Sequence, residues 1–220
     1  MKEQLIKYRK QYLGNYHDRT MTMTAGSFAV NAAIGTGKLI VGIIFSSQWV
    51  ILTAVYYLLL CAARGNILWK SKRIAGIEDP IKKLDRQLSA YRHSGAFIGL
   101  IGVSYLFVCL RMYFIGESAT YPYYIIFGIA AVAFYKISMA IYGIGVTRRK
   151  NNPILSSIKM IGLVDACVSI VAVQCALLTM ENAASPTTSS ALLGMACSVM
   201  FVTLGLYMLC QKKNYPAHAL

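Results

Sequence analysis

Blocks of about 20 mostly apolar residues, the length that a helix needs to cross the ~30 Å core of a bilayer, recur along this chain and constrain its fold more than any other feature. Only 14% of its 220 residues are charged and 57% are apolar, whereas a soluble domain carries about 25% charged residues. The pattern predicts an all-α integral membrane protein, a six-transmembrane-helix bundle. The expected spans are residues 25–46, 48–69, 95–115, 122–146, 154–180 and 188–210.

Lysine and arginine are divided unevenly between the connections. Turns 46–47, 116–121 and 181–187 contain neither residue, whereas the termini and the other two connections hold 17 of the 22 basic residues. By the positive-inside rule, this predicts that both termini and the second and fourth loops face the cytoplasm. The net charge of +14 then reflects topology and contact with membrane lipids, and not a nucleic-acid-binding surface.

The chain divides into three predicted parts. Residues 1–24 form a cytoplasmic amphipathic segment, residues 25–210 the membrane domain and residues 211–220 a short cytoplasmic tail. The first apolar run begins near Ser27, after a charged segment that lacks the compact apolar region of a signal peptide, so no cleavable signal is expected. We expect the chain to reside in the plasma membrane.

Two of the cytoplasmic stretches have helical periodicity without the length of a span. In residues 79–93, Asp79 and Pro80 suit the N-cap and first position of a helix, and apolar residues then recur on one face. Residues 2–13 show a similar amphipathic pattern. Each stretch is expected either to lie on anionic lipid or to pack beneath the membrane domain.

Three charged residues are predicted near the middle of the membrane. Lys38, Lys136 and Asp165 each lie about 15–20 Å from the cytoplasmic end of a predicted span, at ~1.5 Å of rise per residue. A charge facing lipid there costs about 2.5–3.5 kcal/mol, so we expect the three to point inward and to be partly paired. Arg64 and Arg111 lie nearer to span ends, where a long side chain is expected to reach the headgroups.

The three charges allow two interpretations. They are either a buried ion pair that holds helices together, or a site for a substrate or for proton coupling. Because two lysines face one aspartate, one lysine is either neutral or paired with an anionic group of a ligand. A weak similarity of residues 33–45 to residues 131–143 aligns Lys38 with Lys136, in the manner of inverted repeats in secondary transporters.

Small residues also carry two predictions about packing. Gly95 and Gly99 have the spacing that permits close helix approach, either within one chain or in a dimer. All six cysteines lie inside or at the end of apolar blocks, without the spacing of a disulfide framework or a zinc finger. They are interpreted as reduced packing residues.

The spans together resemble the transmembrane domain of the cation diffusion facilitators, which are proton-coupled zinc and manganese exporters. The similarity covers most of residues 27–210: six spans, a very short first turn at Ser46–Ser47, and a first span that reads Asn31, Lys38 and Gly42. It implies the same membrane scaffold, a homodimer and a second-ligand segment at residues 162–169, with Asp165 as the best candidate metal ligand.

Most of the metal site implied by this resemblance is missing from the chain. The family places two Asp or His ligands one turn apart on each of two spans, but this chain has Tyr57 and Cys61 on the one and Ile161 before Asp165 on the other. Because residues 211–220 form only a short tail, the family's cytoplasmic metal-binding domain is not expected. A softer metal site formed by Cys61, Cys167 and Met160 is a further alternative.

These observations predict a secondary transporter, with proton coupling as one expectation and a cation or small charged solute as its substrate. The expected site contains Asp165, Lys38 and Lys136. Its predicted lining residues are Asn31, Tyr57, Cys61 and Gln174. The alternative is a scaffold or partner subunit that does not transport. No cofactor is expected, and no catalytic motif favours an enzyme.

Overall fold

The structure, a computed structural model, describes residues 20–33, 35–37, 39, 40, 43, 44, 48–116, 123–148, 152–181, 183 and 185–211. All regular secondary structure in these residues is helical. An N-terminal helix is described from Thr20 through residue 33 and at several later positions. The complete helices are α2 (Gln48–Ala75), α3 (Pro80–Ile115), α4 (Tyr123–Arg148), α5 (Pro153–Met180) and α6 (Pro186–Cys210).

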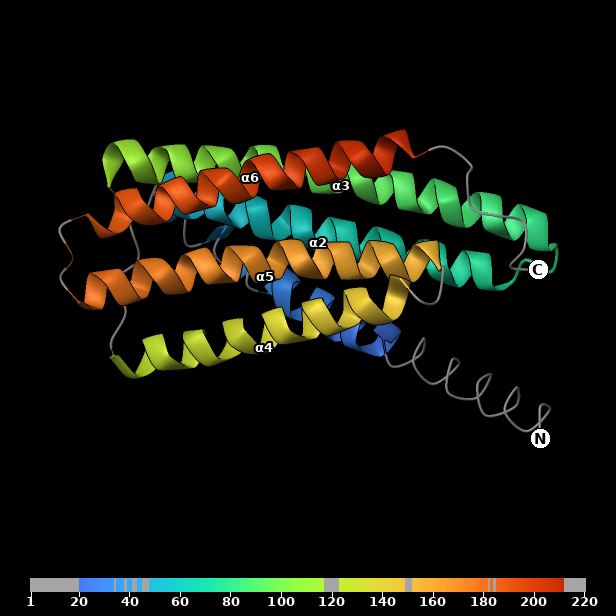
Figure 1. Cartoon of the computed structure of the whole chain (residues 1–220), viewed down its shortest axis with the longest axis horizontal. Helices are drawn as coiled ribbons and strands as arrows, with labels where there is room; N and C mark the ends of the chain where they lie inside the picture. The colour runs from blue at the N-terminus through green and yellow to red at the C-terminus, as the bar shows by residue number, and fades with distance from the viewer. Residues whose placement is uncertain are drawn as a thin grey trace.

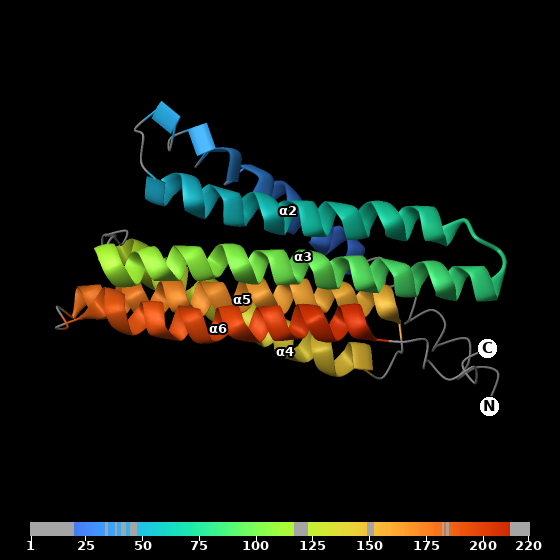
Figure 2. The same cartoon turned by 90° about the horizontal axis from the view of Figure 1, so that it is seen from above.

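The helices run up and down in one elongated bundle (Figure 1). The C-terminal ends of α2, α4 and α6 and the N-terminal ends of α3 and α5 meet at the end drawn on the right. Helix α5 contacts each of α2, α3, α4 and α6, so it is the central element. Seen from above, α3 and α6 lie side by side, and the N-terminal helix crosses α2 at the other side of the bundle (Figure 2).

Four helices in the described part of the chain are long and apolar enough to cross a membrane: α3, α5, α6 and residues 126–147 of α4. Large apolar side chains also lie exposed on their outer faces, as Phe127 and Phe134 do on α4. A water-soluble bundle turns such residues inward, whereas lipid solvates them. The helices therefore fit a membrane protein, as the sequence predicts. The expected first span lies partly outside the described residues, and α2 is not one of the four.

The predicted separate helix at residues 79–93 is wrong, because these residues form the first part of the 36-residue helix α3. The predicted N-cap is confirmed: Asp79 accepts hydrogen bonds from the backbone N–H groups of Ile81 and Lys82 at 3.0 and 3.4 Å. No proline interrupts the chain between Pro80, the first residue of the helix, and the apolar block, so the helix continues. Leu88 is buried in the bundle, whereas Ile81 is 71% exposed. The predicted amphipathic stretch 2–13 lies outside the described residues.

Glycines bring α3 and α6 into backbone contact. A Cβ atom at Gly95 would lie 2.7 Å from Met208 Cβ and 2.9 Å from the carbonyl oxygen of Gly205. A Cβ atom at Gly205 would lie 2.7 Å from the backbone of both Gly95 and Gly99. Of the two uses predicted for these glycines, packing within one chain is therefore the one seen here. Further along the same contact, the ring centroids of Tyr105 and Phe201 lie 6.2 Å apart, with the two rings tilted by 37°.

We predict that Gly95→Ala lowers the free energy of unfolding by about 1–3 kcal/mol, because the new methyl group forces α3 and α6 apart. Gly99→Ala is the matched control on the same helix, since a Cβ atom at Gly99 meets nothing within 4 Å. The control is expected to change stability by no more than about 1 kcal/mol. Unfolding in mixed micelles, followed by circular dichroism, measures both. Equal stabilities of the two variants would contradict the close contact.

Candidate functional site

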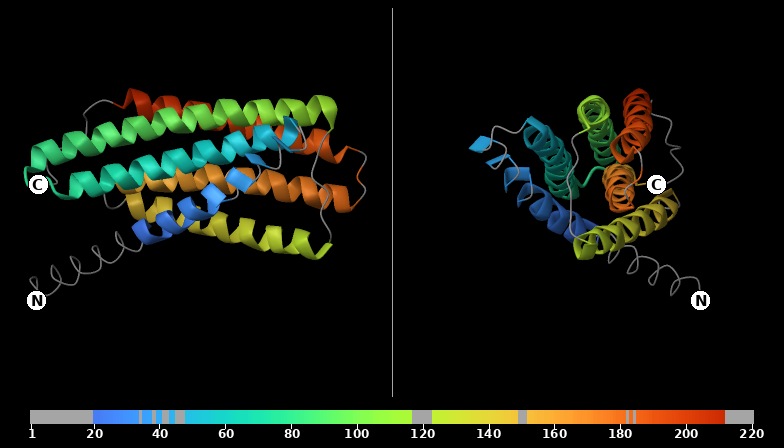
Figure 3. Two further views of the ribbon diagram at one scale, coloured as in Figure 1. Left: turned by 180° about the vertical axis from the view of Figure 1, so that it is seen from behind. Right: turned by 90° about the vertical axis from the view of Figure 1, so that its left-hand side faces the viewer.

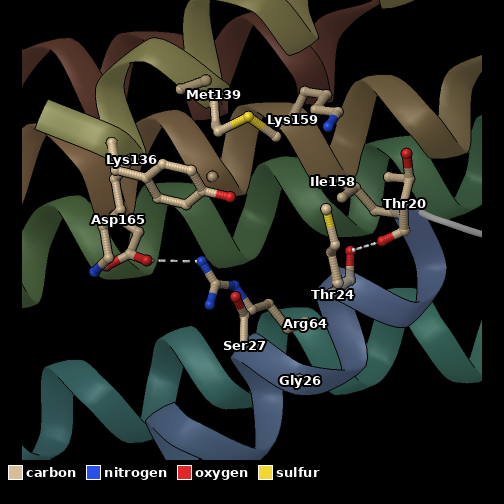
Figure 4. Close-up of a pocket in the computed structure, with 14 residues that line it drawn as sticks. Thr20, Thr24, Gly26, Ser27, Arg64, Lys136, Met139, Ile158, Lys159 and Asp165 are labelled. Carbon is tan, nitrogen blue, oxygen red and sulfur yellow. Dashed lines mark hydrogen bonds and ion pairs between the residues drawn. The ribbon is translucent and has the colours of Figure 1, made fainter. Parts of the chain in front are cut away.

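One carboxylate joins three helices near the centre of the bundle. Asp165 of α5 accepts a hydrogen bond from Arg64 Nη2 of α2 at its Oδ2, over 2.8 Å, and another from Lys136 Nζ of α4 at its Oδ1, over 3.1 Å. The side chains of Arg64 and Asp165 are each only 8% exposed, and that of Lys136 is 34% exposed. We call these three residues the Asp165 network; Figure 4 shows them at the edge of a pocket.

Each member of the network lies close to the middle of its helix. Asp165 is 12 residues from Pro153 and 15 from Met180, since α5 runs from 153 to 180. Lys136 is 13 residues from the start of α4 at 123 and 12 from its end at 148. At ~1.5 Å of rise per residue, both lie roughly 20 Å from either helix end. The shared depth predicted for Lys136 and Asp165 thus corresponds to direct contact.

The prediction for Arg64 is wrong. It placed this side chain near a span end, within reach of headgroups, but α2 continues to Ala75 and leaves Arg64 11 residues from the end. The guanidinium group is buried and paired with Asp165. A signal for this was present in the sequence, because Tyr57, Cys61 and Arg64 recur at intervals of four and three residues and so share one helical face.

Ser169 completes the polar contacts around Asp165. Its hydroxyl donates to the backbone carbonyl of Asp165 over 2.8 Å and accepts a hydrogen bond from Lys136 Nζ over 3.2 Å. Lys136 therefore donates to both a carboxylate and a hydroxyl of α5, one turn apart. These two bonds orient its ammonium group toward α5 and away from lipid.

A first cavity, of about 390 Å³, lies between the N-terminal helix, α4 and α5. We call it the N-terminal cavity. Its charged lining residues are Arg64, Lys136, Lys159 and Asp165. Figure 4 shows Arg64 between Asp165 and Ser27 of the N-terminal helix, with Lys159 further along α5. Apolar wall is contributed by Met23, Met139, Ala140 and Ile158.

A second cavity, of about 570 Å³, lies between α2, α4 and α5. We call it the tyrosine cavity, because Tyr56 and Tyr57 line it together with Lys136, Asp165 and Ser169. Tyr56 is only 2% exposed, and its hydroxyl has no hydrogen-bond partner among the described residues. A buried hydroxyl left unpaired costs about 1–3 kcal/mol, so this group is placed for a partner inside the cavity.

The two cavities meet at the Asp165 network. Along α5 the N-terminal cavity is lined by residues up to Asp165, and the tyrosine cavity by residues from Asp165 onward. The same division holds on α4, where Lys136 lines both cavities. The end-on view in Figure 3 shows how α2, α4, α5 and the N-terminal helix, whose residues line the two cavities, are arranged. Asp165 and Lys136 therefore separate one space from the other.

The remaining predicted site residues are distributed differently. Tyr57 lines the tyrosine cavity. Cys61 is buried, with its Sγ 3.9 Å from the backbone carbonyl of Phe28, and lines neither cavity. Asn31 is 4% exposed, and its Nδ2 has no hydrogen-bond partner in the described part of the chain. Gln174 lies nine residues beyond Asp165 on α5 and is separated from the network by roughly 13 Å of helix rise. Lys38 lies outside the described residues.

Metal-ligating side chains do not cluster at the site. Among the described residues, no three His, Cys, Asp or Glu side chains come together in a way that holds a metal ion. The carboxylate of Asp165 contacts an arginine and a lysine instead of side chains that could share a metal ion with it. Two cations next to Asp165 oppose the approach of a third.

Comparison with protein-family models and with curated proteins finds no match to this chain.

Double-mutant cycles are expected to rank the two ion pairs. With Arg64→Met, Lys136→Met and Asp165→Asn, the coupling energy of Arg64 to Asp165 should be about 1–3 kcal/mol, because both groups are desolvated. The coupling of Lys136 to Asp165 should be smaller, since its side chain is 34% exposed. Unfolding in mixed micelles measures each variant. A larger coupling for Lys136 would contradict the geometry described above.

Proposed function

We propose that this protein is a secondary transporter of the plasma membrane, with six transmembrane helices and both termini in the cytoplasm, in which the Asp165 network controls access between two cavities. The observation that carries the proposal is the position of Asp165 and Lys136 on the walls of both cavities. In alternating access a central site opens first to one side and then to the other. A site that already borders a cavity toward each end of the bundle has the arrangement that this cycle needs.

The charges of the Asp165 network suit a conformational step between the two states of an alternating-access cycle. While Asp165 is ionised, it holds α2 and α4 against α5 through Arg64 and Lys136. Protonation of the carboxylate, or the arrival of a charged solute, weakens both ion pairs at once. Because the pairs join three different helices, such a change alters helix packing and not only local charge.

The uneven distribution of basic residues and the resemblance to cation diffusion facilitators support the six-span topology. In that reading the N-terminal helix and α2 are the first two spans, and the family's scaffold is kept while its metal site is replaced by the Asp165 network. The homodimer is carried over from the resemblance.

A scaffold without transport activity is the second candidate function, and buried ion pairs that merely hold helices together favour it. In that case Asp165→Leu combined with Lys136→Met would leave the biological role intact. The unpaired hydroxyl of Tyr56 favours the transporter, because a purely structural network gains nothing from a polar group without a partner.

Asp165→Asn is expected to abolish transport, because the amide cannot exchange a charge with a proton or solute. Purified protein in liposomes, loaded with a pH-sensitive dye, is given gradients of Zn²⁺, benzyltrimethylammonium or benzenesulfonate. At least one probe should move faster than in empty liposomes, and the variant should lower that rate to the empty-liposome value.

Asp85→Asn on the exposed surface of α3 is the control. Size-exclusion chromatography checks the fold of each variant. No flux with any probe, or full flux in Asp165→Asn, would remove the proposal.

Filling either cavity is also expected to slow transport. Gly162 lines the N-terminal cavity and Gly128 the tyrosine cavity, and a Cβ atom at either position meets nothing within 4 Å. Gly162→Leu and Gly128→Leu therefore place bulk in the cavities without touching a charge. Gly145→Leu on α4 is the matched control, since Gly145 is open in the same way and lines neither cavity. If all three variants transport equally fast, the cavities are not the route.

A further inference from the structure

The charges around the N-terminal cavity do not balance. Arg64 and Lys136 are cationic, and both pair with Asp165, the only carboxylate among the described lining residues. Arg64 and Lys136 alone share a single carboxylate and leave an excess of +1. A positive excess in a low-dielectric site attracts an anion and repels a cation.

The guanidinium group of Arg64 offers more donors than its hydrogen bond to Asp165 uses in the described part of the chain. A guanidinium group has five N–H donors, and the structure shows one of them in use in the described part of the chain, from Arg64 Nη2 to Asp165 Oδ2. The Tyr56 hydroxyl adds a donor on the side of the tyrosine cavity. Both carboxylate oxygens of Asp165 already accept a hydrogen bond. A ligand that supplies acceptor oxygens satisfies these donors, whereas a metal cation or an ammonium group adds to the imbalance.

The rest of the N-terminal cavity suits an apolar body attached to such an anionic group. Met23, Met139 and Ile158 form apolar wall, and Gly26 and Gly162 keep space open. The volume of about 390 Å³ falls within the usual range for small-molecule sites. Methionine side chains adapt to different apolar shapes, which favours a class of small amphipathic solutes.

We infer that the solute of this site is a small organic anion, whose carboxylate or sulfonate pairs with Arg64 and Lys136 while its apolar part lies between the N-terminal helix, α4 and α5. The claim that this anion is transported rests on the proposed function, whereas the claim that it binds does not. The anion and the carboxylate of Asp165 then compete for the same two cations. Binding of the anion is therefore favoured when Asp165 is neutral.

This competition makes Asp165→Asn diagnostic. If the solute is a cation, loss of the carboxylate removes its partner and weakens binding. If the solute is an anion, the same change removes a competitor and tightens binding by about tenfold or more, the effect expected from removing one nearby charge. Arg64→Met should weaken binding of the anion in both the wild type and the Asp165→Asn background.

Three probes with the same ring separate charge from shape: benzenesulfonate, neutral benzenesulfonamide and cationic benzylammonium. Equilibrium binding to the full chain is measured by calorimetry in nanodiscs of phosphatidylcholine. The wild type should bind benzenesulfonate and neither of the other two. Tighter binding of benzylammonium, or equal binding of all three, would overturn the inference. This arm needs no variant, so it holds even if Asp165→Asn fails to fold.

Two further arms identify the site and the source of the anion. Gly162→Leu should abolish benzenesulfonate binding, whereas Gly145→Leu should not; equal effects would place the anion elsewhere and overturn the inference.

Because a lipid headgroup carries the same anionic chemistry, binding is repeated with phosphatidylglycerol in the nanodiscs. Weaker binding there identifies a headgroup as an occupant of the site, and unchanged binding identifies a free solute.

The two proposals fail separately. Protein that binds benzenesulfonate in nanodiscs but moves none of the probes in liposomes overturns the transporter and keeps the anion site. Protein that moves benzyltrimethylammonium or Zn²⁺, and binds benzylammonium more tightly than benzenesulfonate, overturns the anion site and keeps the transporter.

Discussion

The structure depends on the desolvation of a single carboxylate. Asp165 lies near the middle of the central helix, only 8% exposed at its side chain, where an ionised group persists only if it is paired and hydrogen-bonded. Arg64 and Lys136 supply that pairing from two different helices. The same contacts that make the charge tolerable therefore join α2, α4 and α5, and the cavities on either side end where these side chains meet.

The helices were the most predictable part of this chain, because the length of an apolar block and the charge of the connections beside it are local properties of the sequence. The expected spans 122–146 and 154–180 differ from α4 and α5 by no more than two residues at either end. The N-cap at Asp79 was also predictable from its neighbour Pro80. Helix α3 was predicted as two separate parts, because its first residues are amphipathic whereas the span that follows is apolar, and the structure joins them in one helix.

The site was predictable in part. The depth of Lys136 and Asp165 indicated that they meet, since charges in an apolar environment must find partners. Arg64 was misplaced because its depth was judged from the end of an apolar block, whereas α2 continues into the charged residues that follow. Tyr56 could not be distinguished from Tyr57 by pattern. Which of two adjacent tyrosines turns inward is decided by neighbouring helices, and Tyr56 packs 5.6 Å from the ring of Tyr105 on α3.

The backbone contact between α3 and α6 limits how such a bundle can change shape. Gly95 and Gly205 face one another at one register, with side chains such as that of Met208 beside them. Sliding one helix along the other by a turn would push a side chain into the space that only a hydrogen atom fills, so a piston-like displacement meets a steric barrier. Rotation of α4 and the N-terminal helix about the α3–α6 pair meets no such barrier at this contact. The glycines thus fix α3 and α6 to each other, so a change of shape is expected to move α4 and the N-terminal helix relative to this pair.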